Sequence, residues 1–105
     1  MPLSDFRIPS AQTNLQFVEI IADEGRMRGI ARIERAIIED AFPNEDYHKN
    51  RLRIIERNLN ALTPIIQAKY DTGQYTDYTD SLGITTGNDR LIVIGRNDLL
   101  GVRLK

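Results

Sequence analysis

Residues 15–42, LQFVEIIADEGRMRGIARIERAIIEDAF, carry the pattern that decides the fold. Residues 15–21 are rich in β-forming side chains, and Asp23-Glu24-Gly25 has the composition of a turn. Residues 26–33 then alternate between an apolar side and a side that carries arginines. We therefore predict a β-hairpin with one buried and one solvated face. The residues expected on the buried side of its second strand are Met27, Gly29, Ala31 and Ile33.

The same stretch continues directly into a short helix. Ile33, Ile37 and Ala41 recur every four residues, which is helical spacing. We expect this helix to end near Phe42, because Pro43 disfavours helical geometry in the residue that precedes it.

Residues 45–70 hold the most regular pattern in the chain. Apolar side chains recur at steps of three and four residues and form one broad helical stripe, made of Leu52, Ile55, Leu59, Leu62 and Ile66. Pro64 interrupts the pattern, and a proline inside a helix removes a backbone hydrogen bond at a cost of about 3 kcal/mol. Two outcomes stay open: one helix kinked at Pro64, or two helices with Thr63 as N-cap and Pro64 in the first helical position.

The C-terminal part of the chain has a different composition. Residues 70–89 include four aspartates and no basic residue between Tyr70 and Asp89, and we interpret them as a long loop or an irregular β segment. Residues 91–94, LIVI, have the character of a short buried strand, and residues 99–104 are expected to form a last strand.

These elements together predict an α+β fold. We expect a small, mostly antiparallel sheet, made of the N-terminal hairpin plus C-terminal strands and packed by a short and a long helix. Residues 15–105 are assigned to a single domain. Residues 1–14 are assigned to an N-terminal arm that need not be ordered.

The amino-acid composition limits the classes of function that this chain can have. Leu, Ile, Val and Phe make up 30 of the 105 residues, which is enough for a folded core. The chain has no Cys and one His, which excludes disulfides, thiol nucleophiles and any site that needs two imidazoles. We expect no enzymatic activity, no cofactor and no metal. Because no apolar run is long enough for a signal-peptide core or a membrane span, we expect a cytoplasmic protein without a membrane partner.

Residues 33–42, IERAIIEDAF, resemble a stretch found in a family of small uncharacterised bacterial proteins of unknown function. In that family a hairpin is followed along the chain by an isoleucine, then by a short helix with paired acidic residues, and then by a phenylalanine. Further points of similarity are Tyr47, Asn50-Arg51, Ile55-Glu56, Lys69-Tyr70, Gly73 and the strand at residues 92–94. The resemblance implies the same order of hairpin, two helices and strand, and it implies no functional residue.

The net charge of −1 hides an uneven distribution of charge. Eleven of the 14 basic residues are arginines. One interpretation is a guanidinium cluster that binds phosphates or anchors a partner, formed by Arg26, Arg28, Arg32, Arg51, Arg53 and Arg57. The alternative is that these arginines pair with nearby acids on solvated faces.

The acidic stretch of residues 70–89 is a second candidate contact region. Tyr70, Tyr75 and Tyr78 offer a large contact area with a polar tip, which suits a protein interface, whereas an ordinary surface loop is the simpler interpretation. Its aspartates match no EF-hand pattern. His48 has no partner for a catalytic dyad that the sequence shows.

Two hypotheses of function follow. The first is a non-enzymatic interaction module, expected to be a homodimer, whose contacts come from the hairpin edge or from the long helix. The alternative is a nucleic-acid-binding regulator that uses the arginines as phosphate contacts, although the net charge does not support a general nucleic-acid binder. Salt-sensitive binding and convergence of the arginines on one face would distinguish the two.

Overall fold

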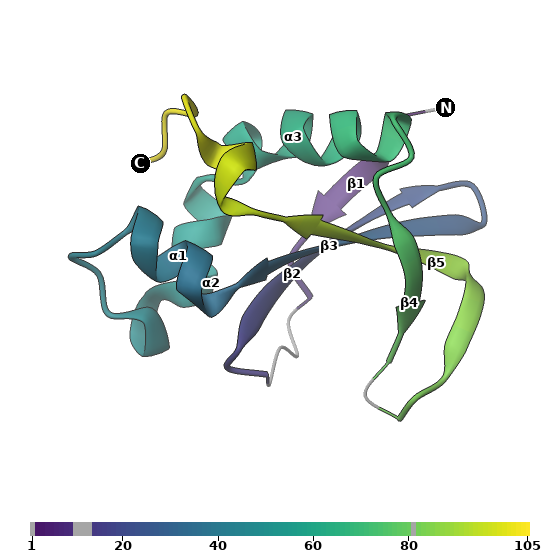
Figure 1. Cartoon of the computed structure of the whole chain (residues 1–105), viewed down its shortest axis with the longest axis horizontal. Helices are drawn as coiled ribbons and strands as arrows, with labels where there is room; N and C mark the ends of the chain where they lie inside the picture. The colour runs from purple at the N-terminus through teal and green to yellow at the C-terminus, as the bar shows by residue number, and fades with distance from the viewer. Residues whose placement is uncertain (1, 10–13, 81) are drawn as a thin grey trace.

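A five-stranded sheet with helices packed on one face forms the structure, a computed structural model that describes residues 2–9, 14–80 and 82–105 (Figure 1). Its strands are β1 (Ser4–Arg7), β2 (Phe17–Glu24), β3 (Met27–Glu34), β4 (Thr76–Thr79) and β5 (Thr85–Ile94). Its helices are α1 (Arg35–Ala41), α2 (Tyr47–Arg57) and α3 (Leu59–Asp71), followed after β5 by the 3-10 helix η1 (Arg96–Leu99). The strand order across the sheet is β1-β2-β3-β5-β4. The predicted α+β class is confirmed.

Strands β2 and β3 form the predicted hairpin. They pair antiparallel over their whole length, from Phe17 opposite Glu34 to Glu24 opposite Met27. Gly25 opens the turn with a φ of +59°, a left-handed conformation that glycine adopts without steric cost. Alternate residues face the helices, and the most buried of them are Val18, Ile20, Ala22, Gly29, Ala31 and Ile33.

The centre of the sheet is parallel, so the expectation of a mostly antiparallel sheet is wrong. β5 pairs with β3 in parallel from Asp89 opposite Arg28 onwards, and β4 pairs with β5 antiparallel at the outer edge. The reason lies in the helices: α3 carries the chain back to the end of the molecule where β3 begins, so β5 runs in the same direction as β3 (Figure 1). Within the apolar run of residues 91–94, Ile92 and Ile94 are buried in the core, whereas Val93 is 47% exposed, so this strand is buried on one face only.

The segment assigned to the N-terminal arm contributes the edge strand β1. It pairs antiparallel with β2 in an irregular register, with a φ of +57° at Asp5. Leu3 is buried and lies over Gly29, where an added Cβ would stand 3.2 Å from Leu3 Cδ1. Residues 2–9 thus belong to the sheet and its packing, whereas residues 1 and 10–13 of the expected arm lie outside the described residues.

The long helical pattern divides at Asn58, so neither outcome expected at Pro64 occurs. Helices α2 and α3 meet there, and Pro64 lies inside α3. The buried Asn58 side chain donates from Nδ2 to the carbonyl of Ile54 at 2.8 Å, and its Oδ1 accepts from the backbone N–H of Lys105 at 2.7 Å. Asparagine side chains compete with the helical backbone for such partners, so the chain leaves helical geometry at this residue.

Residues 70–89 are more regular than a loop, because β4 and the first part of β5 form a second hairpin. Within the described residues, pairing with β3 begins at Asp89, so residues 85–88 extend beyond β3. The end of this hairpin projects from the body of the molecule (Figure 1). We call residues 76–88 the hairpin arm; residue 81 within it lies outside the described residues.

The chain after β5 turns away from the sheet. Asp98 Oδ2 accepts the N–H of Gly95 at 2.7 Å and closes η1, and Gly101 follows with a φ of +76°. The strand expected over residues 99–104 is therefore wrong: a turn and an irregular tail take its place.

One apolar core lies between the sheet and the helices. Its largest fully buried side chains, among the described residues, are Val18, Ile20, Ile33, Ile38, Ile54, Ile66, Ile92 and Ile94. The radius of gyration of 13.3 Å matches a compact chain of about 100 residues. No helix in the described part of the chain combines the length and apolar character needed to cross a bilayer.

Candidate functional site

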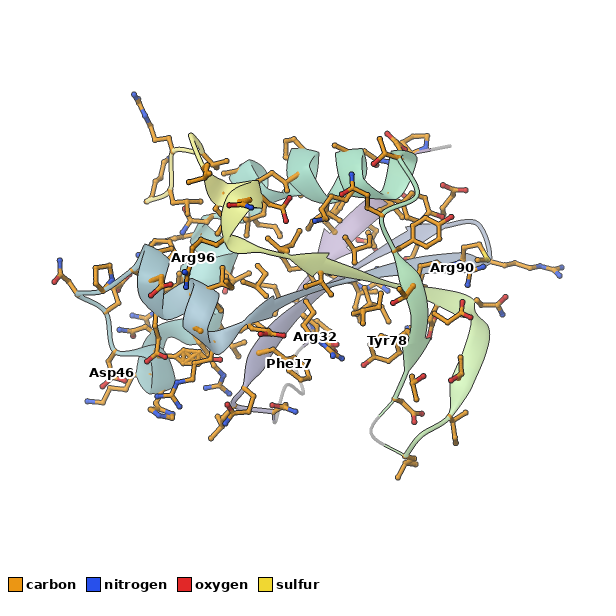
Figure 2. The ribbon with its side chains drawn as sticks, viewed as in Figure 1. Phe17, Arg32, Asp46, Tyr78, Arg90 and Arg96 are labelled. Atoms are coloured by element: carbon orange, nitrogen blue, oxygen red, sulfur yellow. The ribbon has the colours of Figure 1, made fainter. Side chains whose placement is uncertain are left out.

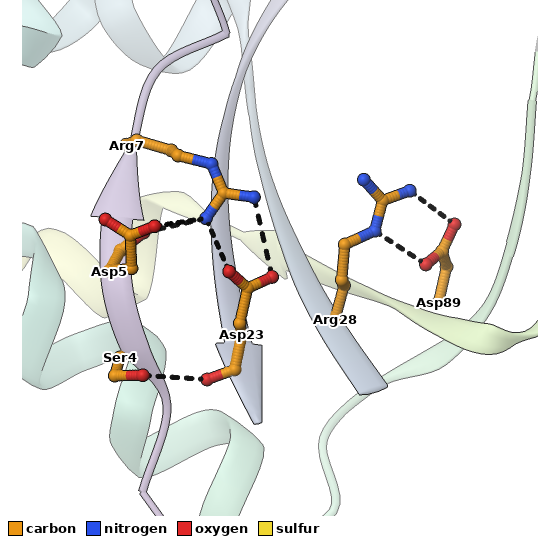
Figure 3. Close-up of polar contacts among 6 residues, drawn as sticks. All are labelled: Ser4, Asp5, Arg7, Asp23, Arg28 and Asp89. Atoms are coloured by element: carbon orange, nitrogen blue, oxygen red, sulfur yellow. Dashed lines mark hydrogen bonds and ion pairs between the residues drawn. The ribbon is translucent and has the colours of Figure 1, made fainter. Parts of the chain in front are cut away.

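The sheet face opposite the helices, which we call the open face, carries ion pairs between neighbouring strands (Figure 3). Arg28 on β3 donates from Nε and Nη2 to the two carboxylate oxygens of Asp89 on β5, at 3.0 and 2.9 Å. Hydrogen bonding to Asp89 raises the pKa of the Arg28 guanidinium, and burial opposes this only in part. Arg28 is thus committed to a bidentate bond inside the sheet.

A second pair extends this row to the edge strand. Arg7 on β1 donates from Nη1 to Asp23 Oδ2 on β2 at 2.8 Å and also lies 3.2 Å from Asp5 Oδ2 (Figure 3). Ser4 Oγ donates to the carbonyl of Asp23 at 3.3 Å. Such exposed pairs contribute at most about 1 kcal/mol each. Their alternating signs across the strands favour this strand register over a shifted one.

Arg32 lies near the middle of the open face, between two aromatic rings (Figure 2). Its guanidinium carbon is 4.0 Å from the ring centroid of Phe17 and 5.8 Å from that of Tyr78, and its Nη2 donates to Glu19 Oε2 at 3.0 Å. The Tyr78 hydroxyl donates to Glu19 Oε1 at 3.2 Å, and burial together with Glu19 raises the pKa of this phenol. Tyr78 thus reaches from β4 to Glu19 on β2 across two intervening strands, and Ile30 on the open face of β3 is 3% exposed.

Three more arginines of the predicted cluster lie on α2, which packs on the opposite side of the sheet. Arg51 donates from Nη1 to the carbonyl of His48 at 3.1 Å, Arg57 donates to Glu45, and Arg53 is exposed. The side chains that hold α2 on the core are Tyr47, Ile54 and Ile55.

The six predicted arginines therefore do not gather on one face. Arg26 is exposed in the turn of the β2–β3 hairpin, Arg28 and Arg32 lie on the open face, and the other three lie on the helix side. Of the six, Arg28, Arg32 and Arg57 hold carboxylates. These three arginines therefore pair with nearby acids, as the second interpretation of the arginine cluster expects.

The three tyrosines of the predicted contact loop also lie in two different places on the molecule. Tyr70 at the end of α3 and Tyr75 before β4 stack on each other, with ring centroids 5.4 Å apart. Arg90 lies 5.8 Å from the Tyr75 ring. Tyr78 instead points onto the open face, toward Arg32 (Figure 2). They do not form one shared contact surface.

The tip of the hairpin arm presents two apolar side chains that the sequence analysis did not single out. Leu82 is 81% exposed and Ile84 is 55% exposed. Asp80 builds this tip: its Oδ1 accepts the N–H groups of both Leu82 and Ile84 at 2.9 Å. Thr79 and Thr85 close the base of the turn with a 2.6 Å hydrogen bond between their hydroxyls. Two large aliphatic residues inside an otherwise polar stretch are the sequence signal for this feature.

A groove lined by both apolar and polar atoms lies between α1 and the C-terminal tail. Its volume is about 530 Å³, and its lining comprises Ile37, Asp40, Ala41, Arg96, Leu99, Leu100, Val102 and Leu104. Arg96 donates to Asp40 across the groove, joining the segment after β5 to α1. Leu100 is 71% exposed, so a large part of this apolar surface faces water.

The described residues hold no group of three or more His, Asp or Glu side chains that could bind a metal ion. His48 is exposed at the start of α2 and packs edge-to-face on Tyr47, with ring centroids 5.8 Å apart. Neither the arginines nor the tyrosines form a site in which a substrate would meet a nucleophile and a base. Among the described residues, the hairpin tip and the groove are two exposed apolar features, and Leu15, Tyr75 and Val93 are further exposed apolar side chains.

Comparison with models of known families, with curated proteins and with solved structures found no match to this chain. The resemblance of residues 33–42 to a bacterial family therefore stays a prediction.

Proposed function

We propose that this chain is a non-enzymatic interaction module that works as a homodimer, and that the tip of the hairpin arm is its contact element. The observation that carries this proposal is the exposure of Leu82 and Ile84 on a turn built by Asp80. Burying one Leu or Ile side chain contributes about 1.5–3 kcal/mol, so two such side chains supply the core of a contact.

The construction of the tip supports a binding role over incidental exposure. Both aliphatic residues are fixed by hydrogen bonds from their own backbone N–H groups to one carboxylate. A contact element that is rigid before binding loses less conformational entropy when it docks.

The experiment is sedimentation velocity of the full chain over a wide concentration range. We expect a concentration-dependent dimer for the wild type. The double variant Leu82→Asp, Ile84→Asp is expected to sediment as a monomer, because it places two carboxylates where the contact needs apolar surface.

Leu15→Asp is the matched control. Leu15 is 43% exposed, precedes β2 and is not part of the hairpin arm, so the same chemical change there should leave the dimer intact. Far-ultraviolet circular dichroism checks that all variants remain folded. A wild type that stays monomeric at high concentration contradicts the proposal.

A further inference from the structure

We infer that the groove between α1 and the C-terminal tail is the receptor for the hairpin tip of a second copy of this chain. This inference rests on the proposed function, since it names the surface that the tip of the arm contacts. The groove and the tip are then the two halves of one interface, and each copy carries both.

The groove offers an aliphatic side chain apolar contacts beside a polar part of its lining. Its walls are formed by Ile37, Leu99, Leu100, Val102 and Leu104, and its polar lining comes from the Asp40–Arg96 pair. A volume of about 530 Å³ falls within the range of roughly 300–1,000 Å³ that is typical of small-ligand pockets. Two side chains of the size of Leu82 and Ile84 fit within such a space.

Charge favours the same pairing. The hairpin arm carries Asp80 at its tip and Asp77, which lies 3.4 Å from Arg90, and it carries no basic residue. The tail that borders the groove carries Arg103 and Lys105, and its two other charged side chains are already paired, Arg96 with Asp40 and Asp98 with Lys69. An acidic arm therefore meets a basic rim, and complementary charge of this kind steers association and selects the orientation.

The positions of the two surfaces allow a closed dimer. The arm projects at one end of the molecule, and α1 and the C-terminus lie at the other (Figure 1). A tip cannot reach the groove of its own chain without unfolding the sheet. Two copies related by a two-fold axis and placed side by side in opposite directions can each insert a tip into the groove of the other, which closes the assembly at two chains.

Mixing experiments test the pairing directly. Leu100→Asp alters an exposed groove residue, and we expect it to weaken dimerisation by about a hundredfold or more, as the tip variant does. A mixture of the groove variant with Leu82→Asp, Ile84→Asp should form mixed dimers, because one intact tip and one intact groove remain. Two copies that associate tip to tip would not be rescued by mixing.

Site-specific disulfides give an independent readout, because the chain contains no Cys. Under oxidised glutathione, a chain with Ile84→Cys mixed with a chain with Leu100→Cys should give a mixed disulfide dimer. Leu15→Cys in place of Leu100→Cys is the control and should give none. The milder Leu100→Ser variant repeats the sedimentation test should Leu100→Asp fail to fold.

The outcomes separate this inference from the proposed function. Should the groove variants dimerise as tightly as the wild type while the tip variant is monomeric, the tip docks elsewhere and the inference is overturned, with the proposed function still standing. A monomeric wild type overturns both. Mixed dimers together with the Ile84–Leu100 disulfide support both.

Discussion

Asp98 is a half-buried acidic residue held by two hydrogen bonds. Its carboxylate accepts from Lys69 Nζ and from the N–H of Gly95, each at 2.7 Å. Burial acts to raise the pKa of Asp98, but these two hydrogen bonds and the charge of Lys69 outweigh it and lower the pKa below the ordinary value of 3.8. The carboxylate thereby anchors η1, and with it the C-terminal tail, to α3.

We predict that Asp98→Asn lowers the free energy of unfolding by about 1–2 kcal/mol at neutral pH, because a charge-assisted bond to Lys69 is lost. The folded-state pKa is lowered, so the contribution of Asp98 is fully present above the ordinary pKa of 3.8 and is lost as the pH falls through the lowered value. Urea unfolding of wild type and variant at neutral and at acidic pH measures this difference, which should shrink in acid.

Asp71→Asn is the control for this prediction. Asp71 is exposed at the end of α3 and, within the described part of the chain, accepts from Gln67 Nε2 at 2.8 Å, so its replacement should change stability little at either pH. A variant at Asp98 that loses the same stability at both pH values would show that the charge of Asp98 has no role.

At the scale of elements, α3 shows how a proline, Pro64, is accommodated inside a helix. A residue other than proline at position 64 would donate its N–H to the carbonyl of Asn60. Thr63 Oγ1 donates to that carbonyl instead, at 3.3 Å. The bend at Asn58 lies a turn and a half earlier, so the proline does not set the direction of the chain.

We therefore predict that Pro64→Ala stabilises the protein by about 1 kcal/mol, less than the roughly 3 kcal/mol ordinary cost of an interior proline because Thr63 already satisfies the carbonyl. Thermal unfolding of the variant measures the gain. The double variant Thr63→Ala, Pro64→Ala should keep most of it, since the new N–H takes over the carbonyl. A loss of stability in the single variant would mean that the ring of Pro64 makes contacts that outweigh the missing hydrogen bond.

At the scale of the whole molecule, the arginines and acids are arranged to pair across strands. The pairs Arg28–Asp89, Arg32–Glu19 and Arg57–Glu45 each hold a guanidinium that the alternative hypothesis assigns to phosphate. Breaking a partly buried pair of this kind leaves a carboxylate without its cation. The molecule as a whole carries a net charge of −1.

We predict that the full chain does not bind duplex or single-stranded nucleic acid in an electrophoretic mobility assay, even at low salt. A phosphate-binding protein releases counterions and shows affinity that falls steeply with salt. A salt-dependent shift that is lost in Arg28→Ala and Arg32→Ala, with the fold retained, would instead support the nucleic-acid hypothesis. Arg103→Ala serves as the control, since Arg103 is exposed on the tail and is not part of the predicted cluster.

The amino-acid sequence by itself determined two local elements of this protein, the β2–β3 hairpin and α1. Alternation over residues 26–33 and the turn at Gly25 specify the β2–β3 hairpin, and the helical spacing that follows specifies α1. These features depend on neighbours within a few residues along the chain, and a single sequence contains all of that information.

Tertiary structure alone decided where distant segments meet. The parallel docking of β5 beside β3, the break at Asn58 with its bond to Lys105, and the entry of β1 into the sheet each join residues far apart in sequence. The same holds for the candidate site, because the groove combines α1 with a tail some sixty residues later. Periodicity reports which face of an element is apolar, but the partner of that face is chosen by the packing of the whole chain.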